Sequence, residues 1–167
     1  MTQRLWAPWR LAYIEKPGPK EGGCIFVDLP AEQDDEKNLI LFRGAKAFVI
    51  LNAYPYTNGH LMIAAYRHTS NMEDLEDEEL LEVQALIRDS VRWLEKAYRP
   101  EGFNIGANLG KAAGAGIEEH LHWHVVPRWV GDTNFMTVTG EARVLAQSLE
   151  DSYTRLKAVV DQEVGIG

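Results

Sequence analysis

The chain has 167 residues, of which 46% are hydrophobic and 25% charged, a composition typical of one globular domain and unlike that of disordered chains. Its formal net charge of -8 argues against a nucleic-acid partner, so a phosphate-bearing ligand needs a local binding site. A single cysteine excludes an intramolecular disulfide, and neither a signal peptide nor a run of ~20 apolar residues is present, so we expect a cytoplasmic protein without a membrane partner.

The first part of the chain is predicted to be mainly irregular. Residues 1–23 are rich in tryptophan, proline and glycine, which predicts an N-terminal arm whose Trp6 and Trp9 pack against the core. The short apolar stretch Cys24–Val27 predicts a strand. The acidic segment Glu32–Lys37 that follows it predicts a solvated loop.

Two β-rich blocks come next, Ala47–Leu51 and His60–Ala65. The segment between them contains Pro55 and the pair Asn58-Gly59, which are turn formers. The two blocks therefore predict a hairpin with a long connection.

A long helix is predicted from Glu73 to Tyr98. Its apolar residues recur every three or four positions, the period of one helix face, and Pro100 and Gly102 then end the helix. The recurring residues are Leu80, Val83, Ile87, Val91, Leu94 and Tyr98. This pattern favours an amphipathic helix with one buried face.

Two more strands are predicted at Asn104–Leu109 and Glu119–Arg128, and helical spacing over Glu141–Val160 predicts an amphipathic helix in the C-terminal extension 131–167. The strands cluster in hairpin-like pairs instead of alternating with helices. We therefore expect one α+β domain over 1–167, with a mainly antiparallel five-stranded sheet, and no domain boundary.

Three histidines, His120, His122 and His124, alternate along the last predicted strand. Alternate side chains of a strand point to the same face, so the three imidazoles should line one surface about 6.5 to 7 Å apart. Imidazole titrates near pH ~6.5, so it can act as a neutral nucleophile on phosphorus or as a donor to phosphate oxygens. The glycine-rich loop Gly110–Gly116 offers backbone N–H groups that can wrap an anion.

The sequence HLHWHVV at His120–Val126 resembles the motif of the histidine triad superfamily, in which histidines alternate with apolar residues. The family's order of features continues in Asn52, the segment Asn58–Leu61, the long helix, Asn108 and the glycine loop, so the resemblance covers residues 24–130. The flanks RLWAPWRLAYI and HVVPRWVGDTNF are similar to a bacterial branch that includes diadenosine tetraphosphate phosphorylases and related hydrolases.

The resemblance implies a nucleotide-binding hydrolase or transferase that acts on dinucleoside polyphosphates or related nucleotides. The middle histidine, His122, would attack the α-phosphorus and form a nucleotidyl-histidine intermediate, which water or phosphate then releases. His124 would contact the α-phosphate, and His120 would orient His122 or assist the leaving group. No cofactor is implied.

The nucleotide contacts are implied by motif position as well. Asn52 would hold the ribose hydroxyls, while Asn108 and the backbone of Gly116 and Ile117 would contact the α-phosphate and stabilise the charge of the transition state. The adenine is expected between apolar side chains, for which the candidates are Ile25, Phe26, Phe48 and Ile50. Family members are usually homodimers, with the helix Glu73–Tyr98 as the expected contact.

The cysteine pattern departs from that of many bacterial relatives, which bind zinc through Cys-x-x-Cys and two histidines. Val27 stands where the second cysteine is expected. A tetrahedral site built from Cys24, His68 and His120 would lack one ligand, so we expect no structural zinc and no metal in the site.

Other departures leave the proposed nucleophile in place. Ile117 lacks the hydroxyl of the serine or threonine found in several relatives, which bears on the leaving group. Asn108 replaces a glutamine of the animal fragile histidine triad proteins, and Trp123 is bulkier than the usual aliphatic residue.

Two other functions stay open at this point. A His-x-His pair can hold a divalent ion, which would make the protein a metal-dependent enzyme. The same pocket without chemistry would make it a sensor of purine nucleotides. We interpret His60 as a structural or supporting residue and the segment Tyr66–His68 as solvated, so neither is placed among the catalytic residues.

Overall fold

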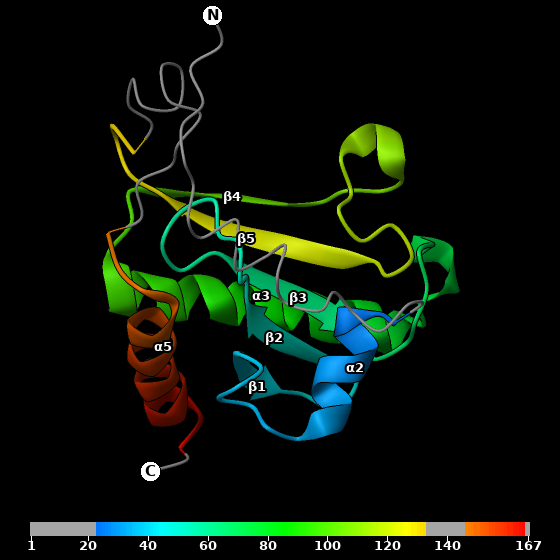
Figure 1. Ribbon diagram of the computed structural model, residues 1–167, viewed down its shortest axis with the longest axis horizontal. Coiled ribbons are helices and arrows are strands. Elements are labelled where there is room, and N and C mark those ends of the chain that lie inside the picture. Colours follow the sequence, from blue (N-terminus) through cyan, green and yellow to red (C-terminus); the bar gives the residue numbers. More distant parts are fainter. Residues whose placement is uncertain (1–22, 133–145, 166–167) are drawn as a thin grey trace, which may run out of the picture.

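A computed structural model describes residues 23–132 and 146–165, which contain a five-stranded antiparallel sheet flanked by helices (Figure 1). The strand order is β1-β2-β3-β5-β4. The strands are β1 (Ile40–Arg43), β2 (Ala47–Leu51), β3 (Leu61–Ala65), β4 (Gly102–Ala107) and β5 (His122–Arg128). The expected α+β class with an antiparallel sheet is confirmed.

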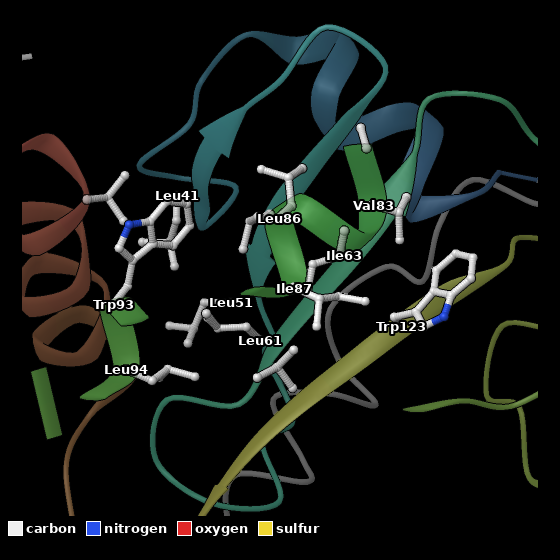
Figure 2. Close-up of a cluster of buried hydrophobic side chains, with 14 of the residues drawn as sticks. Leu41, Leu51, Leu61, Ile63, Val83, Leu86, Ile87, Trp93, Leu94 and Trp123 are labelled. Carbon is white, nitrogen blue, oxygen red and sulfur yellow. The ribbon is translucent and has the colours of Figure 1, made fainter. Parts of the chain in front are cut away.

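The long helix α3 (Asp77–Tyr98) crosses one face of the sheet, and α5 (Leu149–Val164) packs against α3 and β1 (Figure 1). Side chains of α3 meet those of the strands in the main hydrophobic core, as Figure 2 shows. The core residues labelled there are Leu41, Leu51, Leu61, Ile63, Val83, Leu86, Ile87, Trp93, Leu94 and Trp123. This face of the sheet is therefore closed by helices.

The opposite face carries a second, smaller cluster under the helix α2 (Ile25–Glu32). Its buried members are Cys24, Phe26, Ile40, Phe48, Ile50, Met62 and Ala64. Successive residues of a strand point to opposite faces, so Phe48 and Ile50 belong to this cluster while their neighbours in β2 belong to the main core. Because both faces are covered, β2 and β3 are apolar at every position.

The prediction of a strand at Cys24–Val27 is wrong, because this segment begins α2. Cys24 is the extended N-cap residue, and its carbonyl oxygen accepts hydrogen bonds from the N–H groups of Val27 and Asp28. Phe26 and Pro30, four residues apart, then face the sheet together. A run of four apolar residues does not distinguish a strand from one turn of a buried helix, and here tertiary packing selects the helix.

The β2 and β3 predictions are confirmed within one residue, but the sequence reasoning missed β1. It missed β1 because this four-residue strand follows an acidic loop and ends on Arg43. β1 pairs with β2 through a short turn, and its register shifts between Ile40 and Phe42. The acidic loop, predicted to begin at Glu32, begins one residue later than predicted, because Glu32 is the last residue of α2.

The remaining elements are where the sequence predicts them, with shifted ends. A 3-10 turn, η1 (Met72–Asp74), precedes α3, so the α-helix starts at Asp77 and not at Glu73. The last helix starts at Leu149 and extends to Val164, and residues 141–145 of its predicted range lie outside the described residues. Residues 1–22 of the predicted arm 1–23, with Trp6 and Trp9, lie outside them too. None of the described helices combines the length and apolar character needed to cross a membrane.

Candidate active site

Strand β5 carries the histidines on the sheet face that α2 covers. In the ladder with β3, His122 lies opposite Ala64 and His124 opposite Met62, both members of the smaller cluster. The rings of His122 and His124 are edge to face, with centroids 4.9 Å apart. The alternation of the sequence thus places these imidazoles side by side, as we expected.

His122 is buried, and within the described segments its ring has one hydrogen-bond partner. Its Nδ1 lies 2.8 Å from the carbonyl oxygen of His120. A carbonyl oxygen can only accept, so Nδ1 carries the proton and Nε2 keeps its lone pair. Burial lowers the pKa of His122 below its ordinary value, and the hydrogen bond to His120 opposes this shift only partly. At neutral pH His122 is therefore a neutral imidazole with a nucleophilic Nε2.

His124 is neutral as well, and it contacts a histidine that the sequence reasoning left out of the site. Burial, followed by the nearby His122, lowers the pKa of His124 to about 4. His60 is 0% exposed, and its Nε2 lies 2.9 Å from Nδ1 of His124. The one available signal was position: His60 precedes β3 by one residue, and β3 is paired with the histidine strand.

His120 takes part mainly through its backbone. Its carbonyl oxygen orients His122, while its own Nε2 lies 2.9 Å from the carbonyl oxygen of Ala65 and its Nδ1 lies 3.4 Å from Sγ of Cys24. Burial lowers the pKa of His120. The Phe26 ring lies against both imidazoles, with centroids 5.2 Å from that of His120 and 4.7 Å from that of His122.

Three metal-ligand donors converge behind the site, from Cys24, His68 and His120. Their ligand atoms lie within 4.8 Å of one another. A closed zinc site needs four ligands, and Val27 on the same helix supplies none. Over residues 23–132 and 146–165 the donor set thus stops at three and does not fit a closed structural zinc site. His122 and His124 do not belong to this cluster.

The segment that follows β3 is exposed, as the sequence suggested, and its arginine is engaged in ion pairs. Arg67 forms ion pairs with Glu76 and Glu79 at the start of α3. The His68 ring stacks on that of His120, with centroids 5.2 Å apart.

A pocket of ≈ 420 Å³ opens between the start of α2 and the segment before β5. It is lined by Gly23, Cys24, Ile25, Gly116, Ile117, Glu118 and Glu119. The structure therefore brings together Ile25, Gly116 and Ile117 among the predicted nucleotide contacts. The other apolar candidates, Phe26 and the pair Phe48 and Ile50, are fully buried in the smaller cluster.

The two predicted asparagines directly follow strands of the sheet, Asn108 after β4, which pairs with the histidine strand, and Asn52 after β2, which is separated from it by β3. Asn108 comes directly after β4, whose last residue Ala107 pairs with Trp123 beside His122. Asn52 comes directly after β2, and its amide contacts protein groups: Oδ1 accepts a hydrogen bond of 2.8 Å from the N–H of Tyr54, and Nδ2 lies 3.2 Å from Nδ1 of His60.

The glycine loop contains a short 3-10 helix, η2 (Lys111–Ala113), between two glycines with positive φ. Gly114 has φ 83° there, a conformation that side chains disfavour. Within the described parts of the chain, the N–H groups of Gly116 and Ile117 donate no hydrogen bond to another backbone group. These amides can therefore serve an anion, as the sequence predicts.

Comparison with known proteins identifies the family. Residues 33–130 match the HIT domain family. The chain is 43% identical over 157 residues to a protein of Mycobacterium tuberculosis named AP-4-A phosphorylase. The aligned region spans 90% of this chain and 80% of that protein.

Solved structures show the same fold. A zinc-bound histidine triad family protein from Mycobacterium smegmatis superposes with a TM-score of 0.69 at 24% identity, covering 89% of this chain and 100% of that one. A hypothetical histidine triad nucleotide-binding protein from Sulfolobus tokodaii superposes with a TM-score of 0.66 at 22% identity. The superposition covers 86% of this chain and 93% of that one.

Proposed function

This chain belongs to the HIT domain family, and we propose on that basis that it cleaves dinucleoside polyphosphates of the diadenosine tetraphosphate type at the α-phosphorus. The observation that carries the proposal is the state of His122, which is buried and neutral and holds its proton on Nδ1 through the carbonyl oxygen of His120. The lone pair on Nε2 is then the nucleophile. The relative named AP-4-A phosphorylase supports the substrate class.

In the first step, Nε2 of His122 attacks the α-phosphorus. A P–N bond forms while the bond between the α-phosphorus and the bridging oxygen breaks, and the electron pair leaves with the β-phosphate of the departing nucleotide. The product on the protein is a nucleotidyl-histidine. His122 needs no separate base for this step, because its Nε2 carries no proton.

Negative charge grows on the α-phosphate oxygens during this step. The amides of Gly116 and Ile117 and the side chains of Asn108 and His124 are the groups we assign to these oxygens. The net charge of -8 makes such local donors necessary, because the rest of the surface repels the substrate.

In the second step, phosphate or water attacks the same phosphorus from the side that the leaving group vacated. The P–N bond breaks, its electron pair returns to Nε2, the proton of the attacking water or hydrogen phosphate passes to solvent, and the nucleotide is released. With phosphate the product from diadenosine tetraphosphate is ADP, and with water it is AMP, alongside ATP in both cases. The 43% identical phosphorylase favours phosphate as the acceptor.

Product analysis tests the proposal directly. Purified protein is incubated with diadenosine tetraphosphate, with and without inorganic phosphate, and the nucleotides are separated by ion-exchange chromatography. ADP that forms only with phosphate shows phosphorolysis, whereas AMP in both reactions shows hydrolysis. Tight binding of AMP with no turnover of either kind would instead identify a purine nucleotide sensor and contradict the proposal.

We further propose that the protein is a cytoplasmic homodimer that has no nucleic-acid partner. Leu81, 72% exposed on α3, is an apolar side chain on the helix that the family resemblance assigns to the dimer contact. Analytical ultracentrifugation of the wild type and of Leu81→Glu tests this point. A monomeric wild type would contradict it.

A further inference from the structure

We propose that Arg67 is a positioning residue, whose ion pairs with the start of α3 hold the first two residues of the histidine motif in place beside His122. The inference deepens the proposed function and rests on it for its catalytic meaning. The contacts that carry it join protein groups alone, so one part of it can be tested without any substrate.

The first two residues of the motif precede the ladders of β5. This strand begins at His122, which pairs with Ala64 of β3, and the pairing with β4 reaches only to Trp123. His120 and Leu121 come before both ladders. The carbonyl oxygen of His120 nevertheless orients His122, because it lies 2.8 Å from Nδ1 of that ring. The contacts that fix His120 and Leu121 therefore also fix the orientation of the proposed nucleophile.

These contacts come from the exit segment, residues 65–69, which begins with the last residue of β3. The carbonyl oxygen of Thr69 accepts a hydrogen bond of 2.7 Å from the N–H of Leu121. The carbonyl oxygen of Ala65 lies 2.9 Å from Nε2 of His120, and the ring of His68 stacks on that of His120. The path of the exit segment thus determines where the start of the motif lies.

Arg67 is the middle residue of the exit segment and attaches it to α3. Its Nε lies 2.8 Å and 3.1 Å from the two carboxylate oxygens of Glu79, and one terminal nitrogen lies 2.7 Å from the carboxylate of Glu76. A guanidinium presents its donors in a planar fork, so one side chain can engage both carboxylates. Because α3 packs against β2, β3 and β5, it gives the segment a fixed point of attachment.

The carboxylate of Glu79 strengthens this attachment because it is only 5% exposed. Burial alone would raise the pKa of Glu79, but the N–H of Glu76 and the guanidinium of Arg67 outweigh it and hold the pKa below its ordinary value. Glu79 is therefore a buried anion that needs its partners. Its ion pair with Arg67 is more constrained than one between two exposed side chains.

A second attachment holds the end of the exit segment. The hydroxyl of Thr69 donates to the carboxylate of Asp74 in η1 at 2.6 Å, and it accepts the N–H of Asn71 at 3.1 Å. Loss of Arg67 should consequently loosen the exit segment without releasing it. A shift of the Thr69 carbonyl oxygen would move Leu121 and, with it, the acceptor that orients His122. Misplacement of a reacting group by about 1 Å can already slow the chemical step strongly.

Hydrogen exchange tests this attachment without substrate. We expect the amide of Leu121 to exchange about 5-fold faster in Arg67→Met than in the wild type, the scale of losing one ion pair, while the ladder amides of β5 keep their rates. Mass spectrometry or NMR of the full chain measures both. This effect in a protein that does not cleave diadenosine tetraphosphate would leave the attachment standing and refute only the proposed function.

Kinetics with diadenosine tetraphosphate test the positioning role. We expect Arg67→Met to lower kcat about 10-fold with little change in KM, because the orientation of His122 changes and the nucleotide contacts do not. Arg67→Lys keeps the charge but not the fork, so it should recover part of the loss. The matched control is Lys96→Met, which breaks the ion pair with Glu163 at the other end of α3 and should keep wild-type kcat.

Three results would overturn the inference. One is a wild-type exchange rate of the Leu121 amide in Arg67→Met. Another is an equal acceleration of the β5 ladder amides, which would show a general loss of stability. The third is the same kcat in Arg67→Met as in Lys96→Met. If circular dichroism shows that Arg67→Met does not fold, Glu79→Gln removes the ion pair from the other side, and wild-type exchange and kcat in that variant overturn the inference equally.

Discussion

The carbonyl oxygen of His120 lies 2.8 Å from Nδ1 of His122, so a residue two positions earlier on the chain determines which nitrogen of His122 keeps its lone pair. The contact uses the backbone of His120, and its imidazole turns instead toward Ala65 and Cys24. The alternating motif thus serves two purposes. It places rings on one face, and it supplies an acceptor for the central ring.

Replacement of His122 by alanine removes the nucleophile. We expect His122→Ala to lower kcat for diadenosine tetraphosphate by at least about 10³-fold, because no other described group offers an equivalent lone pair to the phosphorus. Steady-state product formation measures the effect. The control is Arg88→Ala on the exposed side of α3, and near wild-type turnover in His122→Ala would exclude the histidine mechanism.

Stability should depend on pH through the buried histidines. The pKa of His124 is about 4 in the folded protein, below the ~6.5 of an unfolded histidine, so the unfolded state binds more protons below pH ~6.5. The contribution of His124 to stability is thus present above that pH and is lost as the pH falls toward 4. Between pH 7 and pH 5 the loss is about 2 kcal/mol.

Urea denaturation of the wild type and of His124→Gln at both pH values measures this dependence. The variant should show a smaller fall in unfolding free energy between pH 7 and pH 5, because it lacks one of the shifted groups. An identical fall in the two proteins would mean that His124 has an ordinary pKa.

The turn between β1 and β2 is held by a carboxylate of α3. Glu82 accepts hydrogen bonds from the N–H groups of Ala45, at 2.7 Å, and Lys46, at 2.5 Å. We expect Glu82→Ala to lower the free energy of unfolding by about 1 to 3 kcal/mol, because two backbone donors lose a charged acceptor.

Chemical denaturation measures this loss, with Gln84→Ala on the exposed face of the same helix as the control. Gly44→Ala should destabilise the same turn, since a Cβ there would lie 2.2 Å from Oε1 of Glu82. A stability of Glu82→Ala equal to that of the control would show that the two hydrogen bonds contribute nothing net.

Chelation should leave the protein's thermal stability unchanged, because among the described residues only three donors converge, those of Cys24, His68 and His120. Tm is measured with and without EDTA, and zinc by elemental analysis. Val27→Cys supplies a fourth donor one helical turn from Cys24, and we expect this variant to bind one zinc ion and to gain Tm. A wild type that holds stoichiometric zinc and loses Tm with EDTA would contradict the prediction.

Much of the fold could be predicted from local patterns. The helical period of α3 and the apolar blocks of β2 and β3 located these elements, because each pattern reports a face buried along its own element. The segment Cys24–Val27 was assigned wrongly, since four apolar residues fit either structure and only the sheet surface beneath Phe26 selects a helix. β1 was missed for a similar reason, because its four residues are too few to show a period.

The sequence by itself determined that His122 and His124 share a face, since a strand's period of two is a local property of the backbone. Tertiary structure alone decided which distant groups the imidazoles contact. His60 approaches His124 across 64 positions, and Cys24 approaches His120 across 96. A hydrogen bond depends on positions of atoms within a few tenths of an ångström, and such positions are set only when distant segments pack together.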